Sequence, residues 1–237
     1  MLRKILNSKA YKVVDFIVRL MLLNILLILI SSSLFIIITT FIDDLKFYWY
    51  YILLIPTALT IYPCIVATTD VIKSYIIDKN TGLIKDFFKA FGKYYLKSLL
   101  ISIILIVVIV LFRNSYVYFD TYKYDAPINM VGYILTISFS LILIFAFIHL
   151  SMVIVYFKEI NIIHAVKLSL IISFKELGIT FILLLITVAS IVLSYFFQIY
   201  LILFSFSLVI YFYVLLTKKI YIKLSQTNQG ENNENKN

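Results

Sequence analysis

Long apolar stretches separated by short polar segments dominate this chain. Six such stretches stand out, at residues 16–42, 47–69, 96–113, 131–157, 178–196 and 199–217. A helix that crosses the hydrocarbon core of a bilayer needs about 20 apolar residues. The pattern therefore predicts an all-α polytopic membrane protein. We expect a single bundle of about six transmembrane helices over residues 1–224, followed by a disordered polar cytoplasmic tail at 225–237.

The last two stretches run together without a polar break between Gly178 and Thr217. Their joint length is roughly twice that of one span. A tight turn near Tyr195–Gln198 is the natural division, although no Gly or Pro marks it. The alternative is a five-span protein with one long, tilted or broken last helix.

The composition supports a membrane setting. Of the 237 residues, 63% are hydrophobic and 14% are charged, whereas ordinary soluble domains have about 45–50% apolar and about 25% charged residues. The single cysteine, Cys64, allows neither an intrachain disulfide nor a cysteine-based metal cluster.

The distribution of charge predicts the orientation. With the N-terminus inside, the external segments contain only Lys46, Arg113 and Lys123 of the 21 lysines and arginines. Because cytoplasmic loops are enriched in Lys and Arg, both termini are expected in the cytoplasm. The net charge of +9 then faces the inner leaflet, and no nucleic-acid partner is expected.

An amphipathic helix is predicted at residues 82–97, between the second and third spans. Its aromatic face carries Ile84, Phe87, Phe88, Phe91 and Tyr95, and its basic face carries Lys85, Lys89, Lys93 and Lys97. This pattern is typical of a helix in the membrane interface. Three roles are open: a connector wedged under the bundle, a docking surface for a partner, and a lipid-binding element.

A few polar or helix-kinking residues lie inside the predicted spans and are candidate intramembrane sites. His149 is in the fourth span, and Asn24 follows the i, i+4 pair of Asp15 and Arg19 in the first. Each could line a ligand site or bond a neighbouring helix.

The second span is the most site-like. Its two prolines free backbone carbonyls and its hydroxyls could line the gap. The candidate lining residues are Pro56, Pro63, Thr57 and Thr60.

The signals of catalysis are missing from the sequence. There is no G-x-S-x-G, H-E-x-x-H, P-loop or dinucleotide motif, and the carboxylates lie in loops, tails or span ends. We therefore expect no enzyme activity, no cofactor, no metal and no proton-driven pump.

Residues 56–111 resemble the YesL-like family of bacterial integral membrane proteins, a domain of unknown function. The resemblance rests on IPTALTIYPCIVATTDVIKSYI and IKDFFKAFGKYYLKSLLISIIL, and FIVRLMLLNILLILISS fits the opening span. It implies a bacterial plasma-membrane location and an association with carbohydrate uptake and utilisation, but no catalytic residue.

Three functions follow as hypotheses. The first is a non-catalytic accessory protein beside a carbohydrate uptake system, with transporter subunits as partners. The second is a small, self-associated permease for a small solute, lined by the proline-containing span. The third is a lipid- or envelope-linked structural protein.

Overall fold

The computed structural model describes residues 9–40, 48–78, 82–122 and 127–234, although the side chains of residues 9, 10, 12, 32–40, 48–58, 109 and 227–234 lie outside the description. The elements are α2 (Lys9–Thr40), α3 (Tyr48–Lys73), the π-helical turn η1 (Ser74–Asp78), α4 (Ile84–Tyr122), α5 (Pro127–Tyr156), α6 (Ile162–Lys175), α7 (Leu177–Phe196), α8 (Gln198–Leu203) and α9 (Ser205–Glu234). Helices are the only regular elements in these ranges, which confirms the all-α class.

Five helices in the described part of the chain are long and apolar enough to cross a membrane. They are Val13–Ser31, Ile84–Tyr122, Pro127–Tyr156, Leu177–Phe196 and Ser205–Gln226. They match the first and the last four predicted spans. The predicted span 47–69 falls on α3, whose first side chains are outside the description. The helices are compatible with a multi-pass membrane protein.

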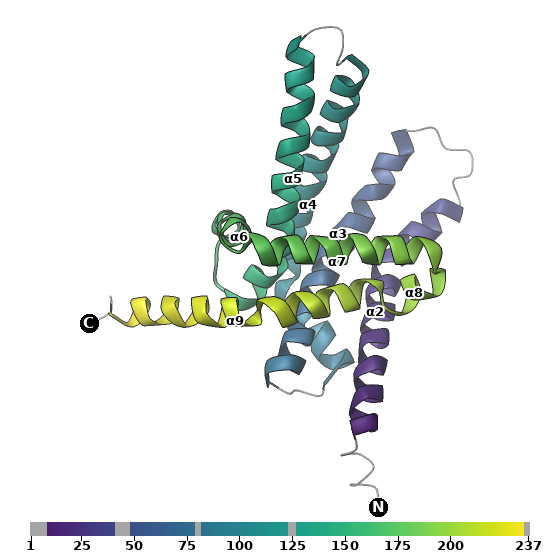
Figure 1. Ribbon diagram of the computed structural model, residues 1–237. Helices are drawn as coiled ribbons and strands as arrows, with labels where there is room; N and C mark the ends of the chain where they lie inside the picture. The colour runs from purple at the N-terminus through teal and green to yellow at the C-terminus, as the bar shows by residue number, and fades with distance from the viewer. Residues whose placement is uncertain (1–8, 41–47, 79–81, 123–126, 235–237) are drawn as a thin grey trace, which may run out of the picture.

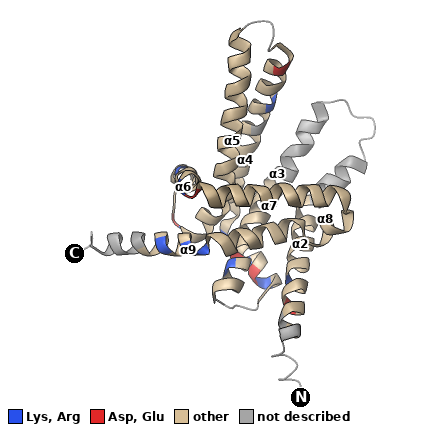
Figure 2. Cartoon of the chain, in the orientation of Figure 1, with Lys and Arg blue, Asp and Glu red and all other residues tan. Residues whose placement is uncertain are grey.

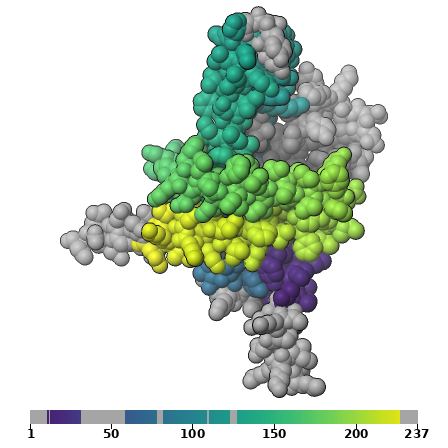
Figure 3. All heavy atoms as spheres, viewed as in Figure 1, coloured from purple at the N-terminus to yellow at the C-terminus, as the bar shows by residue number. Residues whose placement is uncertain are grey.

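The helices form two groups that cross each other (Figure 1). α4 and α5 form a long antiparallel hairpin, while α7 and α9 lie side by side across its direction. Figure 3 shows α7 and α9 in contact along much of their length. α9 also contacts α2, α3 and α5, so it joins the two groups.

α4 corrects the prediction of a separate interfacial helix at 82–97. The predicted connector and the third span form one continuous helix of 39 residues, about 58 Å long at about 1.5 Å per residue. No proline interrupts this segment, so the backbone hydrogen bonds continue through it. The helix continues to Tyr122, and its last turns lie near the tip of the hairpin (Figure 2).

Two helix breaks lie within the apolar stretch between Gly178 and Thr217. The predicted turn near Tyr195–Gln198 is confirmed at Phe197, where φ is −125° and ψ is 90°. A second break at Phe204, with φ of −137° and ψ of −25°, was not predicted. α9 continues to Glu234, into the segment 225–237 that the sequence predicts to be a polar tail.

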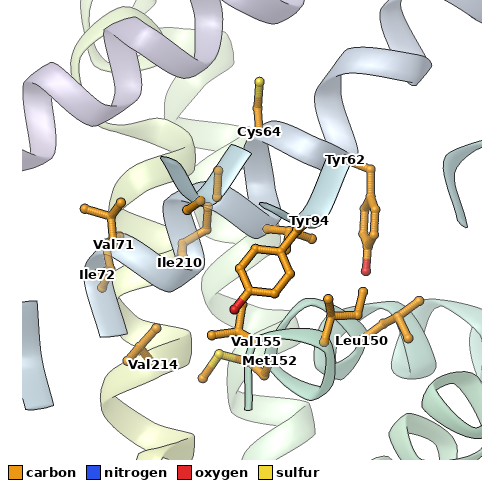
Figure 4. Packing of buried hydrophobic residues seen from close by; sticks show 14 of the residues in the cluster. Tyr62, Cys64, Val71, Ile72, Tyr94, Leu150, Met152, Val155, Ile210 and Val214 are labelled. Carbon is orange, nitrogen blue, oxygen red and sulfur yellow. The ribbon is translucent and has the colours of Figure 1, made fainter. Parts of the chain in front are cut away.

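The core is formed mainly by α2, α3, α4, α5 and α9. Cys64, Val66, Phe87, Val153 and Val214 are fully buried in it. Figure 4 shows the side chains of α3, α5 and α9 interdigitating around Tyr94 of α4. The exposed surfaces of α4, α5 and α7 carry many large apolar side chains, as expected where hydrocarbon rather than water surrounds a helix.

Candidate functional site

Asn24 of α2 closes the break between α8 and α9. Its Nδ2 donates to the carbonyl oxygens of Leu201 at 2.9 Å and Ile202 at 2.8 Å. Its Oδ1 accepts from the backbone N–H groups of Phe206 at 2.9 Å and Ser207 at 3.0 Å. These four bonds use the full capacity of an amide side chain. Asn24 is therefore a structural clamp for unwound backbone, whereas the sequence left open a ligand site or a bond to a neighbouring helix.

The predicted pair next to this clamp is confirmed. Arg19 Nε lies 2.7 Å from Asp15 Oδ2, and the Arg19 guanidinium carbon lies 5.3 Å from the centre of the Tyr75 ring. The pair is only half-buried, so its contribution to stability is small. Asn24, which follows this pair along α2, bonds the α8–α9 break.

His149 of α5 is fully buried and bridges two other helices. Its Nδ1 lies 3.0 Å from the Tyr221 hydroxyl of α9, and its Nε2 lies 2.9 Å from the Thr180 hydroxyl of α7. Ser173 of α6 donates to the carbonyl oxygen of Phe145 at 2.8 Å. The cluster therefore joins four helices near the ends that the predicted topology places in the cytoplasm.

The hydroxyl partners define the neutral form of the ring. Thr180 Oγ1 lies 3.0 Å from the carbonyl oxygens of both Ser173 and Glu176, and these can only accept its hydrogen. We therefore assign the Nε2–H as donor to Thr180, and Nδ1 as acceptor from Tyr221. Every polar atom of the ring is satisfied within the protein, so the structure favours a packing role for His149.

Two of the four predicted lining residues of α3 have side chains within the description. Pro63 is buried and Thr60 is half-buried, while the side chains of Pro56 and Thr57 lie outside the described residues. Tyr62, which was not predicted, has a buried hydroxyl without a hydrogen-bond partner. It faces α5, and Figure 4 shows its ring pointing towards Leu150.

A hollow in the described part of the molecule lies among α3, α5, α7, α8 and α9. It has a volume of about 480 Å³. Its apolar walls include Ile65, Ile144, Phe147, Ile191, Phe206 and Val209. Its hydroxyl groups belong to Tyr62, Ser151, Thr187, Ser190, Ser194, Ser205 and Tyr213. Among the described residues that line it, none is charged.

Most of these hydroxyl hydrogens are used inside the protein. Ser190 donates to the carbonyl oxygen of Ser205 at 3.1 Å, and Ser194 donates to that of Ser190 at 2.7 Å. Thr187 and Ser205 donate to carbonyls of their own helices, each at 2.8 Å. The cavity therefore offers mainly hydrocarbon surface. A helical spacing of hydroxyls at 187, 190 and 194 was the signal that could have located this wall from the sequence.

The first half of α4 is turned differently from the prediction. Phe87 is fully buried and Phe91 is half-buried, whereas Phe88 is 52% exposed. The buried stripe is Phe87, Ala90 and Tyr94. The predicted aromatic face is thus divided. Phe87 packs in the core, whereas Phe88 lies on the surface beside the lysines.

The lysines of this segment are on the surface. Lys85, Lys89 and Lys93 are exposed. They flank Phe88 on the outward side of α4, so a basic surface with an aromatic edge is present, as the sequence predicts.

Comparison with known proteins adds no relative. No protein family, no curated protein and no solved structure matches this chain.

Proposed function

We propose that this chain is a non-catalytic, multi-pass membrane protein that binds an apolar, chain-like molecule in the cavity among α3, α5, α7, α8 and α9. The observation that carries this proposal is the cavity itself, with its uncharged lining. A volume of about 480 Å³ falls within the range of about 300–1,000 Å³ typical of small-molecule sites.

The chemistry of the lining supports an apolar ligand over a sugar or ion. A hydrophilic solute would have to exchange its water shell for hydrogen bonds, but the donors of Thr187, Ser190, Ser194 and Ser205 already bond to carbonyls. A hydrocarbon chain needs no such partners. The small-permease hypothesis is accordingly less well supported than the lipid-linked one.

Photoaffinity labelling tests this proposal directly. The purified protein is incubated with a fatty acid that carries a photoactivatable group in its chain, and the labelled peptides are mapped by mass spectrometry. We expect the label to concentrate on the cavity walls contributed by α5, α7 and α9. An even distribution of label over the outer faces of α4 and α5 would contradict the proposal.

A variant whose larger side chain fills the cavity tests the same site, and it has a matched control. Val209 lines the cavity, and Val209→Trp places an indole in the space where the chain would lie. The control is Val107→Trp, at an exposed position of α4. We expect Val209→Trp to lower the cavity labelling severalfold while Val107→Trp leaves it unchanged. Equal labelling of both variants would count against a defined site.

A second candidate function, an accessory role beside a carbohydrate transporter, has one observation in its favour. Lys85 and Lys89 are exposed on α4 next to the exposed side chains of Ile84 and Phe88. Aromatic residues are enriched at protein–protein interfaces, and basic side chains around them can steer an acidic partner. The link to carbohydrate uptake rests on the resemblance to the YesL-like family alone.

A native pull-down tests this second candidate. The C-terminus is tagged, the protein is extracted in mild detergent, and stoichiometric partners are identified by mass spectrometry. We expect the wild-type protein to recover transporter subunits and the Lys85→Glu, Lys89→Glu variant to lose them. The control is Lys167→Glu, at an exposed position of α6, which should keep them. Recovery of the protein alone contradicts the accessory role.

A further inference from the structure

A second hollow lies between α4 and α5, in the half of the hairpin nearer its tip. We call it the hairpin groove. It has a volume of about 360 Å³ and is lined by Phe112, Arg113 and Tyr116 of α4 and by four residues of α5. One of these four, Ile144, also lines the cavity among α3, α5, α7, α8 and α9. Because the groove and the cavity share a wall residue, a molecule that lies along α5 can occupy both.

The groove and the cavity differ in charge. Arg113 is the only charged residue among the described residues that line either of them. The hydroxyl of Ser140 in the groove donates to the carbonyl oxygen of Thr136 at 2.8 Å, so its hydrogen is already used. The ring of Tyr116 packs against that of Tyr133, with 5.5 Å between the ring centres. The combined hollow therefore has one positive charge, in the groove, and an uncharged remainder.

Arg113 suits an anionic group. Its guanidinium is a planar fork with five N–H donors and binds a carboxylate through two parallel hydrogen bonds. The side chain is exposed, as is that of Leu111 two residues earlier. Asp120 is the only acid among the described residues 98–122 and 127–156. Because an arginine has five donors, Arg113 can bind a ligand carboxylate in addition to a neighbouring side chain.

The path along α5 is long enough for a hydrocarbon chain. Ile137 lines the groove and Ser151 lines the cavity, 14 positions further along the helix. These positions cover about 21 Å at about 1.5 Å per residue, which exceeds half of a hydrocarbon core about 30 Å thick. The predicted topology puts Arg113 in an external segment, at the level where a lipid head group lies. The cavity is then on the side of the groove where the chain of that lipid would continue.

We propose that the ligand is a long-chain fatty acid, whose carboxylate binds Arg113 in the hairpin groove and whose chain passes Ile144 into the cavity. This inference rests on the proposed function and adds the head group and the direction of the molecule. A single guanidinium matches a head group with one negative charge. The contact also offsets the cost of a positive charge beside hydrocarbon.

Three probes of equal chain length test the head group. Palmitic acid, hexadecanol and hexadecylamine are titrated into the purified full-length chain in mild detergent at about pH 8, where carboxyl groups are ionised. Affinity is read from the ligand-dependent rise in unfolding temperature. We expect the acid to bind about tenfold or more tightly than the alcohol, because it adds a charge-assisted contact. The amine should bind most weakly, because it places a like charge beside Arg113.

Two variants that each remove one positive charge from α4 locate the contact. Arg113→Gln acts in the groove, and the control Lys85→Gln acts at an exposed position at the other end of the helix. We expect Arg113→Gln to weaken binding of the acid by about tenfold or more and to leave binding of the alcohol within about twofold. The retained alcohol binding also shows that this variant is folded. Lys85→Gln should leave both affinities within about twofold.

The cavity variant Val209→Trp tests whether one molecule occupies both hollows. Val209 lines the cavity but not the groove. We expect Val209→Trp to weaken the acid and the alcohol alike, because both place their chains in the cavity.

Four results would overturn the inference. Equal affinities for the acid, the alcohol and the amine would show that no charged contact is made, and would leave the proposed cavity site intact. Equal weakening of the acid by Arg113→Gln and Lys85→Gln would show nonspecific attraction to positive charge. Acid binding that Val209→Trp leaves unchanged would show a ligand confined to the groove. If none of the three probes raises the unfolding temperature, the proposed function fails together with this inference.

Discussion

Replacement of Asn24 by Leu tests whether this one side chain holds the α8–α9 break together. Leu has a similar volume, so the change removes hydrogen bonds and leaves packing nearly intact. Two carbonyl oxygens of α8 and two N–H groups of α9 lose their partner. These groups lie at a helix break in an apolar stretch, and in hydrocarbon no water would replace Asn24.

The expected loss follows from the four bonds. An interhelical hydrogen bond in a membrane protein contributes about 0.6 kcal/mol on average and up to about 1.7 kcal/mol. Four such bonds, at about 0.6–1 kcal/mol each, give a loss of about 2–4 kcal/mol. A change of about 1 kcal/mol shifts the unfolding temperature by about 2–4 °C in a chain of this size, so we expect a decrease of about 5–15 °C.

The single cysteine supplies the assay. Cys64 is the only cysteine in the chain, and its side chain is 0% exposed. A thiol-reactive fluorogenic dye therefore reports unfolding when the detergent-solubilised protein is heated. The matched control is Ser31→Ala, since Ser31 is a buried residue of the same helix that bonds only to carbonyls of its own helix. The control should shift the transition by no more than a few degrees.

The comparison between Asn24→Leu and Ser31→Ala decides the outcome. If both variants unfold within a degree or two of each other, the break at Phe204 is held by packing and the clamp argument is wrong. Asn24→Asp refines the result, because a carboxylate can accept from Phe206 and Ser207 but cannot donate to Leu201 and Ile202. We expect it to be at least as destabilising as Leu.

Three further predictions use the same dye assay. His149→Leu should lower stability by about 1–3 kcal/mol, because buried hydroxyls on two neighbouring helices lose a partner. Gly132→Leu should destabilise the α4–α5 hairpin, because the leucine side chain would overlap the Phe119 ring. Adding Phe119→Ala should recover part of the lost stability, and no recovery would refute the contact between residues 132 and 119. Tyr213→Phe should cost about 0.5–1.5 kcal/mol through the lost bond to Thr187, whereas an unchanged unfolding temperature would show that this α7–α9 bond is not stabilising.

Local patterns in the sequence determined the helical class and most helix positions. Apolar runs of span length recur along the chain, and a helix satisfies its own backbone in hydrocarbon whatever its neighbours are. The turn at Phe197 was also predicted from the length of the apolar stretch alone, because that stretch is about twice as long as one helix needs to cross a bilayer. The pair of Asp15 and Arg19 follows from helical spacing.

Boundaries and polar partners were decided by tertiary contacts. Nothing between Leu96 and Ser98 interrupts the helix, so the predicted connector and span merged into α4. The rotation of α4 could not be read from its sequence either. Phe87 and Phe88 are equally hydrophobic, but only the first faces α3 and the core.

The sites depend on residues that are far apart in the chain. Asn24 forms hydrogen bonds with backbone groups on both sides of the break at Phe204. No Gly or Pro near that break indicates it in the sequence. His149 finds its partners on α7 and α9, and the cavity hydroxyls come from helices that cross it. A sequence shows which residues carry hydrogen-bonding groups, but only the packing of the helices determines which groups meet, because each bond depends on distances that local periodicity does not contain.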